Sequence, residues 1–382
     1  MRVLVVNAGS SSLKLSVLEE EDVVTQQTTI ERWDGADDLD PLRAFLTEVP
    51  DLDGVGHRVV HGGPRYRDSV RVEDEVVTYL DSIADLAPLH NPRATAAIRA
   101  VGDLLPDLPA VAAFDTSFHS TIPVEAATYA LPREWNHTYG LRRYGFHGLS
   151  HAYAVRRAAE IVGRPLADLR VVSCHLGAGA SLCAVRDGQS VDTTMGFTPL
   201  AGLVMQTRTG SVDPGLVLWL LEHAHLDVTT LGQVLEHQSG LKGLSGTSGD
   251  HRDVLAAHEA GDADATLALD VYLHRLVREI GAMVASAGGL DLLVFTGGIG
   301  EHAVAIRERV CRGADWLGVD IDSAANKAGG PRISTAGSRV SAWVIPTNEE
   351  LMIARHTRRL MAGLSPRTAS DVDASRTLSE EV

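Results

Sequence analysis

The feature of this sequence that most restricts its fold is a strand–turn–strand segment that occurs twice. Residues 2–18 contain two apolar, β-branched runs joined by a turn of small polar residues, and residues 170–185 repeat this pattern about half a chain later. Asn7 in the first turn aligns with His175 in the second. Two such units in one chain predict an internally duplicated, two-lobed architecture.

The remaining chain alternates between helical and extended patterns, which is typical of the α/β class. Short capping signals and apolar periodicity predict the following elements: a helix capped by Ser150 and running to 162, a helix opened by Asp213 and Pro214, an amphipathic helix over 265–287, a buried strand over 292–296 followed by a helix through Cys311, and a last helix over 349–361 capped by Asn348. Residues 365–382 are rich in Ser, Thr, Asp and Glu, which predicts a disordered tail.

Charge and cysteine content restrict the partners of the protein. The 382 residues include 34 basic and 50 acidic side chains, a net charge of −16, which disfavours nucleic acid and anionic membranes as partners. The three cysteines have no zinc-ligand spacing and are too few for a disulfide framework. No apolar run has the length of a membrane span or of a signal peptide core, so we expect a cytoplasmic protein.

Three glycine-rich turns follow predicted strands, at residues 7–12, 175–179 and 297–300. Turns without Cβ atoms allow backbone N–H groups to approach phosphate oxygens, so the three together indicate a nucleotide. The P-loop motif is absent. Residues 298–303 match a dinucleotide-binding fingerprint, with Asp320 at a suitable distance, but this motif normally opens its domain rather than ending it.

Three cationic side chains lie in loop-like, glycine-containing segments: Arg58, His147 and Arg208. Arginine binds carboxylates and phosphates through two parallel hydrogen bonds, so these residues are candidates for an anion site. The alternative for each is an ordinary surface ion pair.

The sequence favours a hard metal ion over zinc. Two histidine pairs with i,i+4 spacing begin at His57 and His147, but neither contains the glutamate of the zinc-protease motif, and neighbouring glycines disfavour a shared helical face. Asn7 together with Glu349 or Glu350 offers oxygen ligands suited to Mg²⁺.

Asp115 directly follows the apolar run 110–114. This places it at the carboxyl end of a predicted strand, where the active sites of α/β proteins form. Its alternative role is to cap the following turn.

Taken in order, nine segments of this chain resemble the acetate kinases, within the wider group of acetate and sugar kinases, heat-shock ATPases and actin. The segments are NAGSSSLK (7–14), GHRVVHGG (56–63), PLHNP (88–92), FDTSFH (114–119), RRYGFHGLSH (142–151), HLGAGAS (175–181), DTTMGFTPLAGLVMQTRTG (192–210), FTGGIGEH (295–302) and PTNEE (346–350).

The resemblance implies an α/β fold of the duplicated, actin-like and ribonuclease H-like ATPase type, with a cleft between two lobes. We expect an N-terminal lobe of residues 1–118 completed by 350–364, and a C-terminal lobe of residues 119–349. The family would imply reversible, Mg²⁺-dependent transfer of the γ-phosphoryl group of ATP to acetate, with Mn²⁺ as an alternative metal, and a homodimer.

The resemblance also assigns roles by position. It implies Asn7 and Glu349 as metal ligands, Lys14 near the nucleotide phosphates, Arg58 and Arg208 at the carboxylate and the transferring phosphoryl group, His147 at the transition state, and Asp115 as the catalytic aspartate. The nucleotide site would comprise His175, Leu176, Gly177, Ala178, Gly179, Asp250, His251, Arg252, Gly298, Ile299, Gly300, Glu301 and His302. The acyl pocket would comprise Val60, Leu89, Phe146 and Pro199.

Elementary chemistry is consistent with this reaction. A carboxylate is ionised at pH 7, so it needs no general base, but its repulsion from ATP must be cancelled by positive charge. Asp115 is then expected to orient an arginine or metal-bound water. A propionate or butyrate kinase is the nearest alternative, because one methylene changes selectivity by only ~1–3 kcal/mol. More distant alternatives are a sugar kinase with Asp115 as base, a chaperone-type ATPase, and a dehydrogenase using residues 298–303.

Overall fold

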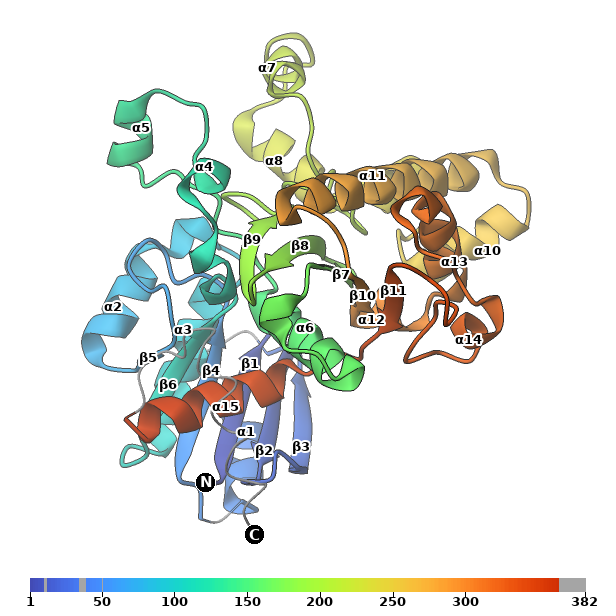
Figure 1. Ribbon diagram of the computed structural model, residues 1–382. Coiled ribbons are helices and arrows are strands. Elements are labelled where there is room, and N and C mark those ends of the chain that lie inside the picture. The colour runs from blue at the N-terminus through green and yellow to red at the C-terminus, as the bar shows by residue number, and fades with distance from the viewer. Residues whose placement is uncertain (10–11, 34–38, 50, 364–382) are drawn as a thin grey trace. The chain divides into compact units, whose positions relative to one another are not determined.

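The computed structural model describes residues 1–9, 12–33, 39–49 and 51–363. The chain divides into two compact units (Figure 1). Unit 1 comprises residues 1–120, 146–153 and the chain from Asn348 onward, and unit 2 comprises residues 121–145 and 154–347. The lobe boundaries expected from the sequence remain a prediction, and the expected tail at 365–382 lies outside the described residues.

Unit 1 contains a mixed sheet in the order β3-β2-β1-β4-β6-β5. Its strands are β1 (Val3–Ala8), β2 (Ser12–Leu18), β3 (Val24–Glu31), β4 (Gly54–Val59), β5 (Val70–Arg71) and β6 (Ala110–Phe114). Its helices are α1 (Asp40–Thr47), α2 (Asp74–Ser82), α3 (Asn91–Leu104) and α15 (Glu349–Met361).

Side chains alternate between the two faces of this sheet, so β1 contributes to two cores. Leu4 and Val6 pack with Ala97 of α3, whereas Val3 and Val5 pack with the apolar side of α15. Figure 1 shows α15, in red, lying across the sheet. A helix from the end of the described chain therefore covers strands from its beginning.

Unit 2 contains a second sheet in the order β11-β10-β7-β8-β9. Its strands are β7 (Val171–Leu176), β8 (Ala180–Arg186), β9 (Gln189–Thr193), β10 (Leu292–Thr296) and β11 (Ser341–Val344). Its helices are α4 (Val124–Ala127), α5 (Arg133–Thr138), α7 (Pro214–His223), α8 (Val228–His237), α9 (Gly240–Ser245), α10 (His251–Glu259), α11 (Ala263–Ala287), α12 (Gly297–His302), α13 (Val304–Gly313) and α14 (Ser323–Lys327). The longest, α11, packs on β7, β8 and β9.

The two sheets share one pairing pattern. In unit 1, β1 pairs antiparallel with β2 and parallel with β4; in unit 2, β7 pairs antiparallel with β8 and parallel with β10. The third pairings also agree, since β2 is antiparallel to β3 and β8 is antiparallel to β9. The duplication inferred from the two strand–turn–strand segments is therefore present in the topology.

Helix α6 (Gly148–Val162) spans the boundary in sequence, with its first residues in unit 1. The prediction that Ser150 caps this helix is wrong, because the helix begins at Gly148, whose N–H group donates to the Asp115 carbonyl at 2.9 Å. The prediction of one helix from the 297–300 turn to Cys311 is also wrong. Ala303, at φ −86° and ψ 82°, leaves the helical region and separates α12 from α13.

In the part of the chain that the structure describes, no helix combines the length and the apolar character that crossing a bilayer requires.

Candidate active site

Three polar side chains in unit 1 lie at the same edge of its sheet. Asn7 is near the end of β1, Arg58 is near the end of β4, and Asp115 directly follows β6. The three strands are parallel neighbours, with Asn7 opposite Arg58 in register. Because the carboxyl ends of parallel strands meet at one edge, the fold brings together residues that are far apart in sequence.

The Arg58 guanidinium is the centre of this group. Its Nε and Nη2 atoms donate to the two carboxylate oxygens of Asp115 at 3.0 and 2.6 Å, which is a bidentate pair. Its Nη1 atom donates to Asn7 Oδ1 at 3.2 Å, and its Nε atom lies 3.6 Å from Glu349 Oε2. The Arg58 side chain is 16% exposed and that of Asp115 is 2% exposed. Asp115 therefore fixes an arginine that still reaches the surface.

Two glutamates at the start of α15 add negative charge to the group. The Asn348 side chain caps this helix by accepting a hydrogen bond from the Leu351 N–H group at 2.9 Å, as expected from the sequence. Glu349 then faces Arg58, and Glu350 forms an ion pair with Lys14 at 2.7 Å.

The electrostatics of the group follow from burial and from these neighbours. Burial opposes the charge of Arg58, but the carboxylates of Asp115, Glu349 and Glu350 outweigh it and raise the pKa of Arg58 above its usual value. Burial raises the pKa of Glu349, and the nearby carboxylates add to this effect despite Arg58 and Lys14. The site thus holds more carboxylate than the two cations compensate, which favours an additional cation.

The predicted metal ligands Asn7 and Glu349 both contact Arg58 within this group. Among the described residues, no three His, Cys, Asp or Glu side chains form a group suited to a metal ion. An amide oxygen and a carboxylate are hard donors, and Mg²⁺ commonly binds through few protein ligands and several waters. The donor chemistry and the excess negative charge fit such an ion.

His147 also belongs to unit 1, and its backbone is strained. Its φ of 57° is in the left-handed region, which non-glycine residues rarely adopt outside constrained sites. The next residue, Gly148, has no room for a side chain, since a Cβ atom there would lie 2.2 Å from the Asp115 carbonyl oxygen. Backbone contact with Asp115 thus fixes the segment that carries His147. Sequence reasoning did not select Gly148, and a glycine opening a helix is its only signal.

The predicted acyl-pocket residues are divided between the units. Val60 and Phe146 are buried in unit 1, where Phe146 contacts His61 edge-to-face at 5.5 Å, whereas Leu89 is 44% exposed. Pro199 is in unit 2, where its carbonyl accepts a hydrogen bond from Arg208 at 3.4 Å.

Arg208 is held less tightly than Arg58. Its Nε atom lies 3.8 Å from Glu236 Oε2, and burial lowers its pKa, which Glu236 only partly offsets. A largely buried guanidinium with a single, long carboxylate contact among the described residues is suited to receive an anion.

The predicted nucleotide segments of unit 2 gather around the ends of β7 and β10. A Cβ atom on Gly297 would lie 2.8 Å from the Leu176 carbonyl oxygen, so the turn after β10 touches the end of β7. The Ala178 carbonyl accepts a hydrogen bond from the Gln206 N–H group at 3.2 Å, and the Gln206 carbonyl accepts one from the backbone N–H group of Lys242 at 2.9 Å. The turn at 175–179 is thereby tied to the loop that carries Arg208.

The third nucleotide segment begins α10. Asp250 caps this helix through the Arg252 N–H group at 2.9 Å and pairs with the exposed Arg252 side chain at 2.7 Å. The hydrogen bonds from Arg252 lower the pKa of Asp250 to about 2. His251 is buried, and its Nε2 atom has no hydrogen-bond partner among the described residues.

Helix α12, which contains Gly298, Ile299, Gly300, Glu301 and His302, is anchored at both ends. The Glu301 carboxylate accepts hydrogen bonds from the N–H groups of Gly297 and Thr347, both at 3.0 Å. Arg307, which is fully buried, donates to the carbonyls of Gly300 and Glu301 at 3.0 and 2.7 Å. Sequence reasoning missed Arg307, whose only signal is a charge among the apolar positions of α13.

Proteins of one known family are similar to this chain over most of its length. The profile of the acetokinase family matches residues 36–355. The acetate kinase of Dictyoglomus thermophilum is 44% identical, with 94% of this chain and 99% of that protein covered. The crystal structure of Porphyromonas gingivalis acetate kinase has a TM-score of 0.88 at 36% identity, covering 94% and 99% of the two chains. A propionate kinase structure from Francisella tularensis has the same TM-score, identity and coverage. The chain has the α/β, actin-like ATPase type of fold of these kinases and belongs to the acetokinase family.

Proposed function

We propose that this protein catalyses reversible, Mg²⁺-dependent transfer of the γ-phosphoryl group of ATP to acetate, giving acetyl phosphate and ADP. The observation that carries the proposal is the Arg58 guanidinium, held by Asp115, Asn7 and Glu349 at the edge of the unit 1 sheet in a member of the acetokinase family. An arginine held in this way keeps its remaining N–H groups in a fixed orientation, in which they can donate to an anionic acceptor.

In the proposed reaction, the acetate oxygen attacks the γ-phosphorus of ATP directly and in line. The acceptor is already ionised, so the protein contributes orientation and charge rather than a base. Arg58 binds the carboxylate, and Arg208 binds the transferring phosphoryl group. His147 stabilises the charge that develops on that group. Asp115 keeps the Arg58 fork in place through its bidentate pair.

The metal ion would be held by Asn7 and Glu349, with Lys14 near the nucleotide phosphates. Mg²⁺, or Mn²⁺ in its place, would neutralise charge on the ATP phosphates. The nucleotide would be bound by three segments: the turn at 175–179, the first residues of α10, and helix α12. The hydrogen bonds of Glu301 and Arg307 would hold the backbone of α12 in place.

Propionate is the second candidate acceptor, because a propionate kinase is as similar in structure as an acetate kinase. One methylene is worth ~1–3 kcal/mol in an apolar pocket, so a single pocket can accept both acids with different efficiency. Butyrate is the next homologue, and Val60 and Phe146, both buried, would limit the space for it.

The test is hydroxylamine trapping of the acyl phosphate in mixtures of protein, ATP and Mg²⁺ with acetate, propionate, butyrate or a sugar. We expect the most hydroxamate with acetate, less with propionate, and none with the sugar. The absence of trapped product with every short carboxylate would refute the proposal. Higher kcat/KM for propionate than for acetate would keep the chemistry and change the substrate.

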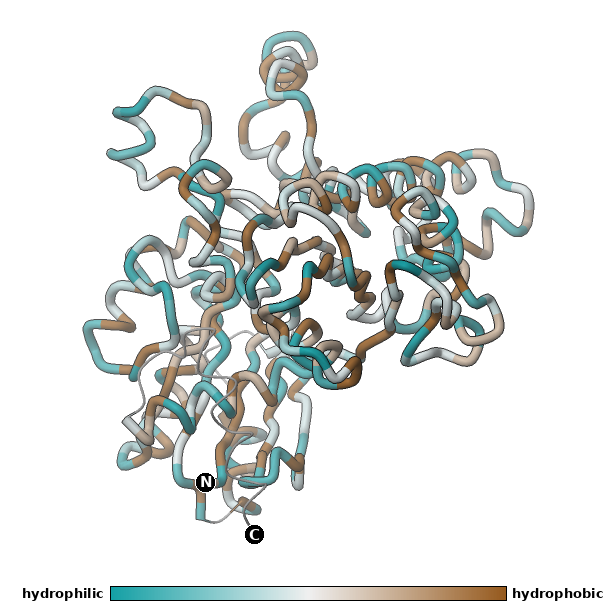
Figure 2. Tube along the Cα trace, viewed as in Figure 1, coloured by the Kyte–Doolittle hydropathy of each residue, from teal (hydrophilic) through white to brown (hydrophobic). Residues whose placement is uncertain are grey.

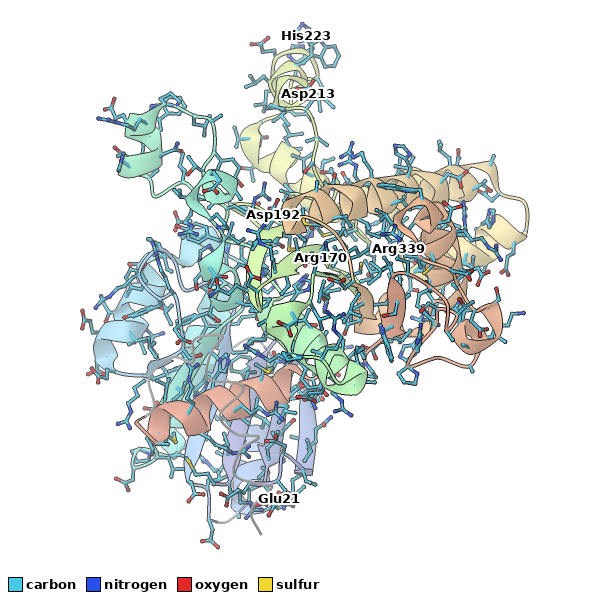
Figure 3. The ribbon with its side chains drawn as sticks, in the orientation of Figure 1. Glu21, Arg170, Asp192, Asp213, His223 and Arg339 are labelled. Carbon is cyan, nitrogen blue, oxygen red and sulfur yellow. The ribbon has the colours of Figure 1, made fainter. Side chains whose placement is uncertain are left out.

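We also propose that two copies of the chain associate through α7. Residues 214–221 of this helix carry no charge, and none of its residues is buried. Leu218 is 62% exposed and Trp219 is 53% exposed. Figure 2 shows the hydrophobic colouring of the helix, and Figure 3 labels Asp213 and His223 at its two ends. An apolar helix of this length is marginal in water without a packed face.

We propose a second copy of the chain as the occupant of the α7 face, because this face is uncharged whereas the chain as a whole is strongly negative. Each chain carries a net charge of −16, so charged surfaces of two copies repel. An uncharged, apolar face is where like-charged copies can approach, and twofold symmetry would place the same face on both sides. The proposed location of the protein is the cytoplasm, in keeping with three buried cysteines that form no disulfide.

A further inference from the structure

We propose that Gly56 is a positioning residue that sets how closely α15 approaches β4 and thereby holds Glu349 beside Arg58. The inference rests on the proposed function, because it concerns a ligand of the proposed metal and the arginine proposed to bind the acceptor. Gly56 itself touches neither the metal nor the substrate.

The evidence begins with the face of β4 that α15 covers. Gly54, Gly56 and Arg58 are two residues apart, so they share one face of the strand. A Cβ atom on Gly54 would lie 2.2 Å from the Met361 Cε atom. A Cβ atom on Gly56 would lie 2.4 Å from Thr357 Oγ1 and 2.7 Å from Ile353 Cγ2.

The helix matches this face along its length. Glu349, Ile353, Thr357 and Met361 are four residues apart, so they form one stripe of α15. The contacts pair the two elements in opposite directions. Glu349 lies beside Arg58, Ile353 and Thr357 lie over Gly56, and Met361 lies over Gly54.

The contact at Gly56 is rigid. Ile353 and Thr357 are fully buried, and both are β-branched, which restricts their χ1 rotation in a helix. The Thr357 hydroxyl is further fixed by donating to the Ile353 carbonyl at 2.9 Å. A side chain at position 56 must therefore move the helix. At position 54 the far end of the flexible Met361 side chain can rotate away, and the other close atom, the Pro109 carbonyl oxygen at 3.2 Å, does not belong to α15.

A shift of α15 would change the contacts that the first turn of this helix makes. Glu349 lies 3.6 Å from Arg58 Nε and Glu350 lies 2.7 Å from Lys14, so both contacts depend on the depth at which the helix sits. Displacement of the helix by ~1 Å separates these charges, and errors of this size in an active site lower rates by ~100-fold. The absence of a Cβ atom at position 56 therefore allows α15 to approach closely enough for Glu349 to contact Arg58, two residues away from Gly56.

The experiment compares the full-length wild type with Gly56→Ala and with the matched control Gly54→Ala, which adds the same methyl group to the same face. Crystal structures give the separation of Arg58 Nε and Glu349 Oε2, and hydroxamate kinetics give the Mg²⁺ concentration for half-maximal activity. We expect Gly56→Ala to lengthen the separation by ~1 Å and raise the Mg²⁺ requirement at least tenfold. Gly54→Ala should stay within twofold of the wild type.

A rescue variant separates position from general stability. Combining Gly56→Ala with Ile353→Leu and Thr357→Ala removes the two atoms that the new methyl group meets, so it should restore the Arg58–Glu349 separation and most of the Mg²⁺ response. If Gly56→Ala alone does not fold, a folded triple variant with the wild-type Arg58–Glu349 separation supports the inference equally. An unmoved α15 in Gly56→Ala, equal effects of the two alanines, or failure of the rescue would overturn the inference. If the wild type makes no acyl phosphate, the proposed function fails, and the structures alone still decide the role of Gly56.

Discussion

The side chain of Arg58 shows how one residue gathers a site from distant parts of the chain. Its partners come from β1, from the end of β6 and from the first turn of α15. Individually, Asn7, Arg58, Asp115 and Glu349 could be selected from the sequence, because each lies at the end of a predicted strand or at the start of a predicted helix. Their hydrogen bonds could not, since the pairing of an arginine depends on side-chain geometry that no local pattern encodes.

Replacing Asp115 with Asn should lower kcat by at least about 100-fold in the hydroxamate assay. The substitution keeps the size of the side chain but removes the charge of the bidentate pair with Arg58. In addition, the amide group of Asn has one NH₂ in place of a carboxylate oxygen, and this NH₂ cannot accept a hydrogen bond from Arg58. Asp103→Asn, at an exposed position in the last turn of α3, is the control and should behave as the wild type. Near-normal turnover in Asp115→Asn would remove both the orienting and the proton-carrying role of this residue.

Stability in acid should depend on His57. Burial lowers the pKa of His57 to about 3 and that of His61 to about 4, from 6.5 in the unfolded chain. Between these values the unfolded state binds more protons, so the free energy of unfolding falls as the pH falls below 6.5, by up to about 1.4 kcal/mol per pH unit for each histidine.

The raised pKa of Glu349 acts in the opposite direction above pH 4.5, so the comparison of variants matters more than the wild-type curve. We expect His57→Leu to lose less stability than the wild type between pH 6.5 and 4, measured by urea unfolding at each pH. Parallel curves for the two proteins would show that His57 is not buried in its neutral form.

Among the helices and strands, those with strong local signals were predicted and those that depend on tertiary contacts were not. The strand at 292–296 and the helix at 349–361 have the predicted bounds, and Asp213 caps α7 through the Gly215 N–H group at 2.8 Å. The start of α6 was misplaced because a contact with the Asp115 carbonyl, distant in sequence, fixes Gly148. The break at Ala303 was missed because no local signal marks it; beyond the break, buried Arg307 donates to the carbonyls of Gly300 and Glu301.

Replacing two helical glycines with alanine should change stability in opposite directions, because the two positions differ in the space around them. Ala is a better helix former than Gly by about 1 kcal/mol, and Gly102→Ala in α3 meets no atom within 4 Å, so it should raise the urea midpoint. Gly148→Ala in α6 should lower it and reduce activity, because its Cβ atom would lie 2.2 Å from the Asp115 carbonyl oxygen. If Gly148→Ala were as stable and as active as the wild type, the backbone of Asp115 would not be the fixed support of the His147 segment.

At the level of the whole molecule, the duplication could be inferred from two short segments because each predicts a hairpin whose two strands are joined by a turn of small residues. The pairing order of the two sheets extends this agreement to strands with no visible sequence likeness, such as β3 and β9. The sequence alone left the shared order unspecified, because strand neighbours are set by packing between elements that are remote in the chain.

The association proposed for α7 predicts a change of mass in solution. Leu218→Glu combined with Trp219→Glu places charges on the exposed apolar helix, so light scattering after size exclusion should show a single chain where the wild type shows two. Leu267→Glu, at a position of α11 that is 54% exposed, is the control and should keep the wild-type mass. A wild type of single-chain mass, or a double variant of unchanged mass, would refute the α7 interface.

The place of α15 in the chain has a consequence for synthesis. A ribosome makes the strands of unit 1 first, then the whole of unit 2, and only afterwards the helix that covers Val3 and Val5. Until that helix emerges, this face of the earliest sheet is covered only in part, by Leu149 and Ala152 of α6, and Arg58 and Asp115 lack the contact with Glu349. A chain that ended before α15 would lack both the cover of Val3 and Val5 and the glutamate beside Arg58, so this charge group can be completed only after unit 2 has been synthesised.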